Sequence, residues 1–190
     1  MKRTLLLSIV LAAFSSSAEA KPWIVDYAHS HIGFNGTANG SAFEGAFKSF
    51  TAAIDFDPDH PETGKISAVI AINGATSGDK QRDTMLPQAD WFNVAAFPEA
   101  QFVSIGIRKT GSDKIGIDDY EAVGTLTIKG FSHPVTLPFS LKREGDYWRV
   151  RGNAVLRRDD FHVGEGDWNN EDYVKYAVTV TIDIAAKPAP

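Results

Sequence analysis

Thr76–Ser104, with the sequence TSGDKQRDTMLPQADWFNVAAFPEAQFVS, is the only long stretch of the expected mature chain that does not read as β-strand or turn. Ser77 or Asp79 can cap a short helix that extends through Met85, and Pro87 limits its continuation. A single helical insertion in an antiparallel chain usually covers an open end or edge of the sheet. We therefore predict a lid whose aromatic side chains pack on the open end of a barrel. These side chains are Trp91, Phe92 and Phe97.

On both sides of this stretch, apolar and polar residues alternate in short runs that are separated by turn signals. Such alternation indicates strands with one buried face. About eight strands without a βαβ rhythm predict an all-β fold, a closed eight-stranded antiparallel barrel. The expected strands are 23–27, 30–38, 42–56, 65–73, 101–108, 120–128, 133–143, 147–156 and 173–184. We also expect a bulge near Lys48–Ser49, a further helical turn at 89–92, and a sheet edge or bulge at Pro138.

Several inward positions of the expected strands carry very small residues, and two interpretations of them stay open. They can leave a cavity, or they can relieve strand curvature in a solid core. An eight-stranded barrel permits either, because its interior can be filled by side chains or hold one slim ligand. The small residues are Ala68, Ala122, Gly124, Gly152 and Ala154.

The first twenty residues have the order of a secretory signal: a positive start at Lys2 and Arg3, an apolar run, and the cleavage site Ala18-Glu19-Ala20. We therefore predict a signal peptide over 1–20, a single domain over 21–190, and a periplasmic location. The formal net charge is −5, and removal of the signal makes it one unit more negative. An acidic exported protein is a poor candidate for nucleic-acid binding. Zero cysteines exclude disulfides and thiol catalysis.

Asp26, His29, Ser30 and His31 contain the residue types of a hydrolase triad. In a strand, His29 and His31 share one face while Ser30 points to the other, so a direct contact between Ser30 and either histidine is awkward. The two histidines also fall short of the three or four ligands that a metal site needs. We therefore predict no catalytic residue and no metal site.

Several motifs, spread in order over nearly the whole expected mature chain, resemble the YceI-like family of periplasmic, lipocalin-like barrels that bind polyisoprenoid lipids. They are His29–Phe34, Arg82-Asp83 before Met85-Leu86, Asp90–Ser104, Gly124–Val135 and Arg158–Phe161. The resemblance implies a lipocalin-like barrel with an isoprenoid tail in its interior. This chain departs from the family pattern at Ala38, Met85 and His162, so the head group stays open between a quinone, a polyprenyl phosphate and another amphiphile.

The leading hypothesis is a secreted lipid-binding protein for transport, storage or stress protection, with no covalent cofactor and an isoprenoid or quinone-like ligand. It would be a monomer or homodimer and not integral to the membrane. One alternative is a small-substrate enzyme, of hydrolase or isomerase type, that acts at the barrel mouth; another is a ligand-free, partner-binding barrel. The expected tail contacts are Ile32, Phe34, Phe47, Phe50, Ile54, Ile70, Ile72, Met85, Phe92, Phe97, Phe102, Leu126, Ile128, Leu137, Phe139, Val178 and Val180. The expected head-group or lid anchors are Asp26, His29, His31, Arg82 and Asp83.

Overall fold

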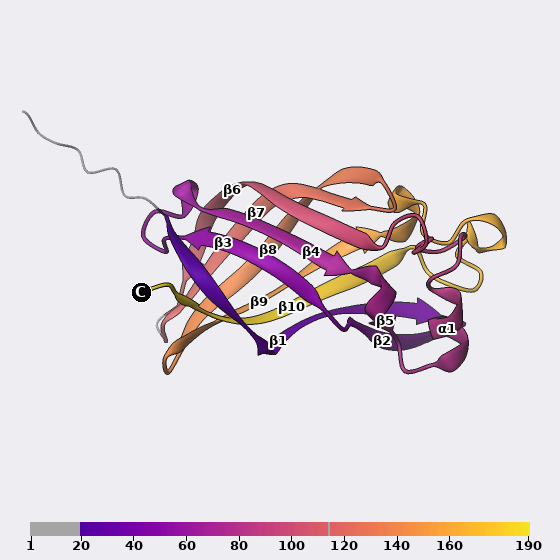
Figure 1. The fold of residues 1–190 in the computed structure, drawn as a ribbon, viewed down its shortest axis with the longest axis horizontal. Helices are drawn as coiled ribbons and strands as arrows, with labels where there is room; N and C mark the ends of the chain where they lie inside the picture. The colour runs from indigo at the N-terminus through magenta and orange to yellow at the C-terminus, as the bar shows by residue number, and fades with distance from the viewer. Residues whose placement is uncertain (1–19, 114) are drawn as a thin grey trace, which may run out of the picture.

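The computed structural model describes residues 20–113 and 115–190, so the predicted signal peptide lies almost wholly outside it. Eight antiparallel strands close into a barrel, and a short helical segment covers one end (Figure 1). Around the ring the order is β10, β9, β8, β7, β6, β4, β3 and β1, and β1 pairs again with β10. The predicted all-β, eight-stranded barrel with a helical lid is confirmed.

Five of the ring strands are longer than the alternating runs suggest, because hydrogen-bonded pairing continues beyond those runs, whereas the strands over 50–56 and 65–71 are shorter than predicted. The ring strands are β1 (Lys21–Ala38), β3 (Phe50–Phe56), β4 (Lys65–Ala71), β6 (Glu99–Ser112), β7 (Ile117–Ile128), β8 (Phe131–Glu144), β9 (Tyr147–Arg157) and β10 (Ala177–Pro188). Two short strands, β2 (Ser41–Phe47) and β5 (Ala75–Thr76), extend the sheet beside the helix α1 (Lys80–Met85). Short 3₁₀ helices are η1 (Pro61–Thr63), η2 (Ile72–Gly74), η3 (Arg158–Phe161) and η4 (Gly166–Trp168).

β1 is one continuous bent strand, whereas the sequence predicted two. Its first residues, Lys21–Trp23, pair with β3, and Ile32–Ala38 pair with β2. Between these two stretches β1 bulges, and its register with β10 shifts between Asp26 and His31. The bulge lets a single strand serve two different neighbours.

The single strand predicted over 42–56, with a bulge near Lys48–Ser49, is instead two strands, because β2 ends at Phe47 and β3 begins at Phe50. Two further local predictions need correction. Residues 89–92 form turns rather than a further turn of helix. β10 begins at Ala177 instead of residue 173, since the chain before it runs over the end of the barrel.

Pro138 lies in the interior strand β8, but its neighbourhood acts as a local edge. β8 pairs with β9 only from Phe139 onward, so residues 131–138 of β8 diverge from β9. η3 fills the resulting space: Phe161 is 2% exposed and its ring lies 5.0 Å from that of His133. The predicted edge at Pro138 is therefore a local one: β8 has no β9 partner up to Pro138 and is paired with β9 from Phe139 onward.

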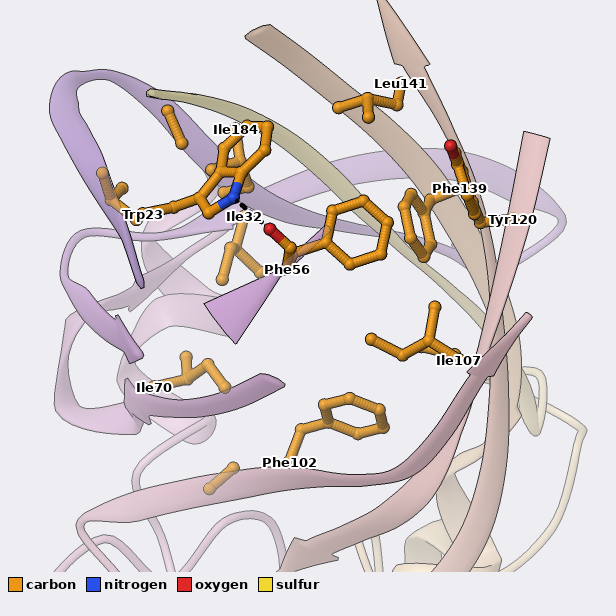
Figure 2. Close-up of a cluster of buried hydrophobic side chains, with 14 of the residues drawn as sticks. Trp23, Ile32, Phe56, Ile70, Phe102, Ile107, Tyr120, Phe139, Leu141 and Ile184 are labelled. Atoms are coloured by element: carbon orange, nitrogen blue, oxygen red, sulfur yellow. Dashed lines mark hydrogen bonds between the residues drawn. The ribbon is translucent and has the colours of Figure 1, made fainter. Parts of the chain in front are cut away.

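The end of the barrel opposite α1 is closed by aromatic side chains (Figure 2). The Trp23 indole nitrogen donates to the Phe56 carbonyl oxygen at 2.8 Å. The ring of Tyr120 stacks on Phe139 at 5.4 Å and meets Phe56 edge-on at 5.3 Å. Tyr120 is 1% exposed, and burial raises its pKa to about 12. This end therefore has a dense core.

At both glycines among the small inward residues, the second interpretation holds, because neighbouring strands fill the space. A Cβ on Gly124 would lie 2.6 Å from the Phe102 ring, and a Cβ on Gly152 would lie 2.5 Å from the Pro138 carbonyl oxygen. These glycines therefore permit close packing rather than open a bore. A ring from a neighbouring strand that covers a glycine is a known way to stabilise a sheet.

Candidate functional site

A cavity of about 260 Å³ occupies the barrel between the aromatic end and the lid. Its wall is apolar except for Arg158. Small residues do contribute to it, namely Ala52, Ala68, Ala100, Ala154 and Ala186. The wall includes these predicted contact residues: Ile32, Phe34, Phe47, Phe50, Ile54, Ile70, Ile72, Phe92, Phe102, Leu126, Ile128, Leu137, Phe139, Val178 and Val180. Whether they contact a ligand stays a prediction.

The structure places two predicted contact residues outside this wall. Phe97 packs on the turn between β7 and β8, where a Cβ on Gly130 would lie 3.1 Å from its ring. Met85 lies in the wall of a second cavity under the lid. Of the three lid aromatics, Trp91 and Phe92 therefore face the main cavity and Phe97 does not.

Asp83 ties α1 to the residues just before it, at the end of β5. Its carboxylate accepts from the Thr76 hydroxyl at 2.6 Å and from the Ser77 amide and hydroxyl at 2.6 and 2.7 Å. The hydrogen bond from Thr76, followed by those from Ser77, lowers the pKa of this carboxyl. Asp79 caps α1 by accepting from the Arg82 amide, which confirms one of the two predicted caps. Asp83 therefore has the geometry of a lid anchor.

A second cavity of about 250 Å³ lies under the lid and shares Phe43, Leu86, Trp91 and Val174 with the main one. Its polar residues include Asn39, Asp79, Gln81 and Arg82. The Arg82 guanidinium lies 4.4 Å above the Phe43 ring, and its Nε donates to the Ser77 hydroxyl. The indole N–H of Trp91 is buried without an acceptor among the described residues. The wall of this second cavity thus carries more polar groups than the wall of the main cavity.

Arg158 holds the loop that closes the lid end, a role that the sequence reading missed. Its side chain is 5% exposed. The guanidinium lies within hydrogen-bond distance of six carbonyl oxygens, those of Val163, Gly164, Trp168, Asn170, Val174 and Lys175. Burial lowers its pKa. The Arg158–Phe161 motif was the only sequence signal, since the acceptors are backbone atoms.

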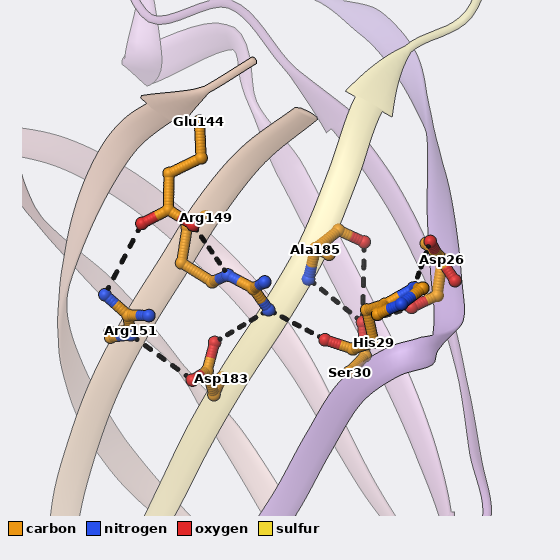
Figure 3. A network of polar contacts seen from close by, with 8 residues as sticks. All are labelled: Asp26, His29, Ser30, Glu144, Arg149, Arg151, Asp183 and Ala185. Carbon is orange, nitrogen blue, oxygen red and sulfur yellow. Dashed lines mark hydrogen bonds and ion pairs between the residues drawn. The ribbon is translucent and has the colours of Figure 1, made fainter. Parts of the chain in front are cut away.

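Asp26 and His29 lie at the bend of β1 (Figure 3), and His31 ends the stretch in which the register of β1 shifts. This bend lies apart from α1 (Figure 1). The Asp26 carboxylate contacts His29 Nδ1 at 2.8 Å, and this hydrogen bond lowers the pKa of Asp26. The Ser30 hydroxyl donates to the Asp26 carbonyl at 2.6 Å and accepts from the Ala185 amide at 3.0 Å. The Ser30 hydroxyl is thus hydrogen-bonded to backbone groups. The structure does not bring this set together with Arg82 and Asp83.

Arg149 completes the polar network at the bend. It donates to the His29 carbonyl at 2.7 Å and to Asp183 at 3.1 Å, and it also pairs with Glu144 (Figure 3). These contacts join the bend of β1 to β9 and β10. Their arrangement is that of a brace on the outer wall.

The described residues contain no group of three His, Asp or Glu side chains that could hold a metal ion. The histidines are dispersed: the His60 ring contacts Asp57, and the His162 ring stacks on Phe131. No helix in 20–113 or 115–190 is long and apolar enough to cross a membrane.

Comparison with known proteins finds relatives of this chain in both sequence and fold. A sequence model described as the YceI-like domain matches residues 23–186. Curated relatives named Protein YceI, from Salmonella arizonae and Salmonella paratyphi B, are 32% identical over 139 residues. That match covers 73% of this chain and 66% of each relative, so the chain spans just under two thirds of their length.

Solved structures share the fold. Burkholderia cenocepacia BcnA is 30% identical with a TM-score of 0.80, over 86% of this chain and 100% of that one. A polyisoprenoid binding domain from Saccharophagus degradans is 13% identical with a TM-score of 0.65, over 89% of this chain and 99% of that one. At such an identity the second likeness concerns the fold alone.

Proposed function

The chain belongs to the YceI-like family, and from this premise we propose that it holds the tail of a polyisoprenoid lipid inside its barrel. One observation carries the proposal: the cavity of about 260 Å³ has an apolar wall whose single charged residue is Arg158. The Arg158 guanidinium already faces six carbonyl oxygens. Such a wall favours a hydrocarbon chain, since a polar ligand would lose its hydration without gaining partners.

The magnitude is adequate for stable retention. Burial of roughly 500 Å² of tail contributes on the order of 12 kcal/mol before the cost of association. The Saccharophagus degradans domain, which shares this fold, is described as polyisoprenoid binding. That description supports the ligand class proposed for this chain.

The head group would occupy the second cavity, next to the lid. The Arg82 guanidinium supplies N–H donors in its wall. Donors of this kind suit a head group with acceptor oxygens, such as a quinone carbonyl or a phosphate. Asp83 serves this arrangement indirectly, because it holds the lid in place.

The proposed setting is the periplasm, where a carrier or store for a water-insoluble lipid has a use in transport, storage or protection from stress. The signal-like order of residues 1–20 supports export. A binding role rather than catalysis is supported by Ser30, whose hydroxyl is engaged with backbone groups of Asp26 and Ala185.

Native mass spectrometry tests the proposal. The protein is prepared without harsh detergent and then offered geranylgeraniol or a short-chain ubiquinone. We expect a co-purified lipid mass or uptake of an offered isoprenoid. A protein that is ligand-free in every preparation and takes up neither compound would refute it, and would favour the partner-binding barrel.

A further inference from the structure

The barrel wall has an interruption between β1 and β3 that the hydrogen-bonded ladder does not close. β1 pairs with β3 only through Lys21–Trp23, opposite Ile54–Phe56. Its next pairs on that side, from Ile32 onward, are with β2. Residues 24–31 of β1 therefore have no ladder partner on β3. In Figure 1 the two strands diverge from one end of the barrel toward the bend of β1.

The Tyr27 side chain spans this seam. The Tyr27 hydroxyl accepts a hydrogen bond from the Ala52 amide at 3.2 Å, across 25 residues of sequence. The Tyr27 ring meets the Phe50 ring edge-on with centroids 5.3 Å apart. Tyr27 is 48% exposed, whereas Phe50 and Ala52 both line the main cavity. The ring of Tyr27 therefore lies between solvent and the cavity wall.

Both edges of the seam are held firmly, so Tyr27 is the part that can move. On one edge, Ser30 and Arg149 fix the bend of β1 to the neighbouring strands. On the other, β3 pairs with β4 without a break from Phe50 to Asp55. Rotation of an exposed side chain requires no change in either edge, and such rotations occur on fast time scales.

The other closures of the barrel are more extensive. The far end is filled by Trp23, Phe56 and Tyr120, each less than 9% exposed. The lid end depends on three hydrogen bonds to Asp83 and on the clamp of Arg158. Opening either end breaks several buried contacts, whereas opening the seam breaks one hydrogen bond and one ring contact. The seam is thus a less costly path between solvent and cavity than either end of the barrel.

We propose that the seam between β1 and β3 is a side portal through which an apolar chain enters and leaves, and that Tyr27 is its gate. This inference rests on the proposed function, because it assigns a route to the ligand proposed there. The chemical class that fits is a slim, unbranched or prenyl-type hydrocarbon chain, since the residues behind Tyr27 are Phe50 and Ala52. Tyr27 is a positioning residue for exchange rather than a catalytic one.

The test measures release of tritiated geranylgeraniol from the loaded full-length mature protein into excess phosphatidylcholine vesicles. Tyr27→Phe removes only the hydroxyl, and we expect release to be about 2- to 10-fold faster, the effect of one hydrogen bond. Tyr27→Ala also removes the ring, and we expect release to be at least about tenfold faster. The matched control is Val155→Ala, at an outward-facing β9 residue that is 69% exposed.

A second measurement does not depend on truncation. The chain has no cysteine, so Tyr27→Cys carries a unique thiol. A bulky methanethiosulfonate adduct on that thiol should slow release at least about tenfold relative to the unmodified variant, and reduction should restore the fast rate. The same adduct on Val155→Cys should change nothing.

The outcomes distinguish a failure of the portal from a failure of the proposed lipid binding. If the wild-type protein does not load geranylgeraniol, the proposed function fails at the loading step and the portal fails with it. If loading is normal but Tyr27→Ala releases the lipid at the wild-type rate, or the adduct at position 27 leaves release unchanged, the portal alone is overturned.

Discussion

Filling the cavity from one residue of its wall should strongly weaken tail binding while leaving the barrel folded. Ala154 lies on β9, is 8% exposed, and faces the main cavity. Ala154→Phe adds about six carbon atoms, slightly more than the five of one isoprene unit. If one unit is displaced, about five methylene equivalents at ~0.8 kcal/mol each lose burial, or about 4 kcal/mol. We therefore expect an affinity lower by about 10²- to 10³-fold.

The assay is a titration of the mature protein with geranylgeraniol, followed by native mass spectrometry, with circular dichroism as the check on folding. Val155→Phe is the matched control, because the adjacent side chain points outward and is 69% exposed. A folded Ala154→Phe variant that binds as tightly as Val155→Phe would show that the tail does not occupy this cavity.

Three further predictions concern the lid end. Arg158→Met should lower the free energy of unfolding by about 3–5 kcal/mol, because six carbonyl oxygens lose a buried donor. Guanidinium denaturation measures this loss, and it should be much smaller for the control Arg157→Met, which changes an exposed neighbouring side chain. Since the pKa of Asp83 is lowered on folding, its hydrogen bonds stabilise the lid fully above its ordinary value of 3.8, and this stability is lost as the pH falls through the lower, folded pKa. Lid protection measured by hydrogen exchange should therefore be constant from pH 7 to about 5 and fall only in acid, and Asp83→Asn should remove that dependence; protection lost at pH 6 in the wild type would contradict it. Phe92→Ala and Phe97→Ala should each lower stability by at most about 3 kcal/mol, but only Phe92→Ala should weaken geranylgeraniol binding, because Phe97 packs on the turn at Gly130; equal binding losses would be inconsistent with this placement.

The direction in which each strand residue faces could be predicted from the sequence. Ile70, Leu126 and Val178 are separated widely along the chain, yet each lines the cavity as its parity indicated. Alternation with a period of two is a local property of a strand, so it needs no knowledge of the neighbours. The cap at Asp79 was predictable for the same reason, since the acceptor and the Arg82 amide are three residues apart.

The contents of the interior could not be predicted in this way. Gly124 has the inward parity of an open position, but the ring of Phe102, 22 positions earlier in the chain, fills its space. Parity tells which face a residue is on and does not tell which side chain from another strand reaches the same place. The same limit explains Phe97, which shares the lid with Phe92 and packs elsewhere.

The sequence by itself therefore determined the class of fold, the strands, the lid and the apolar character of the interior, because these depend on local periodicity and composition. Only the tertiary structure decided how β1 bends, where the wall is left without ladder bonds, and that Tyr27 and Arg158 close the openings. These features depend on register between strands far apart in the chain and on hydrogen bonds to backbone atoms. The contact between the Tyr27 hydroxyl and the Ala52 amide leaves no mark in the sequence, because every residue except proline offers the same amide.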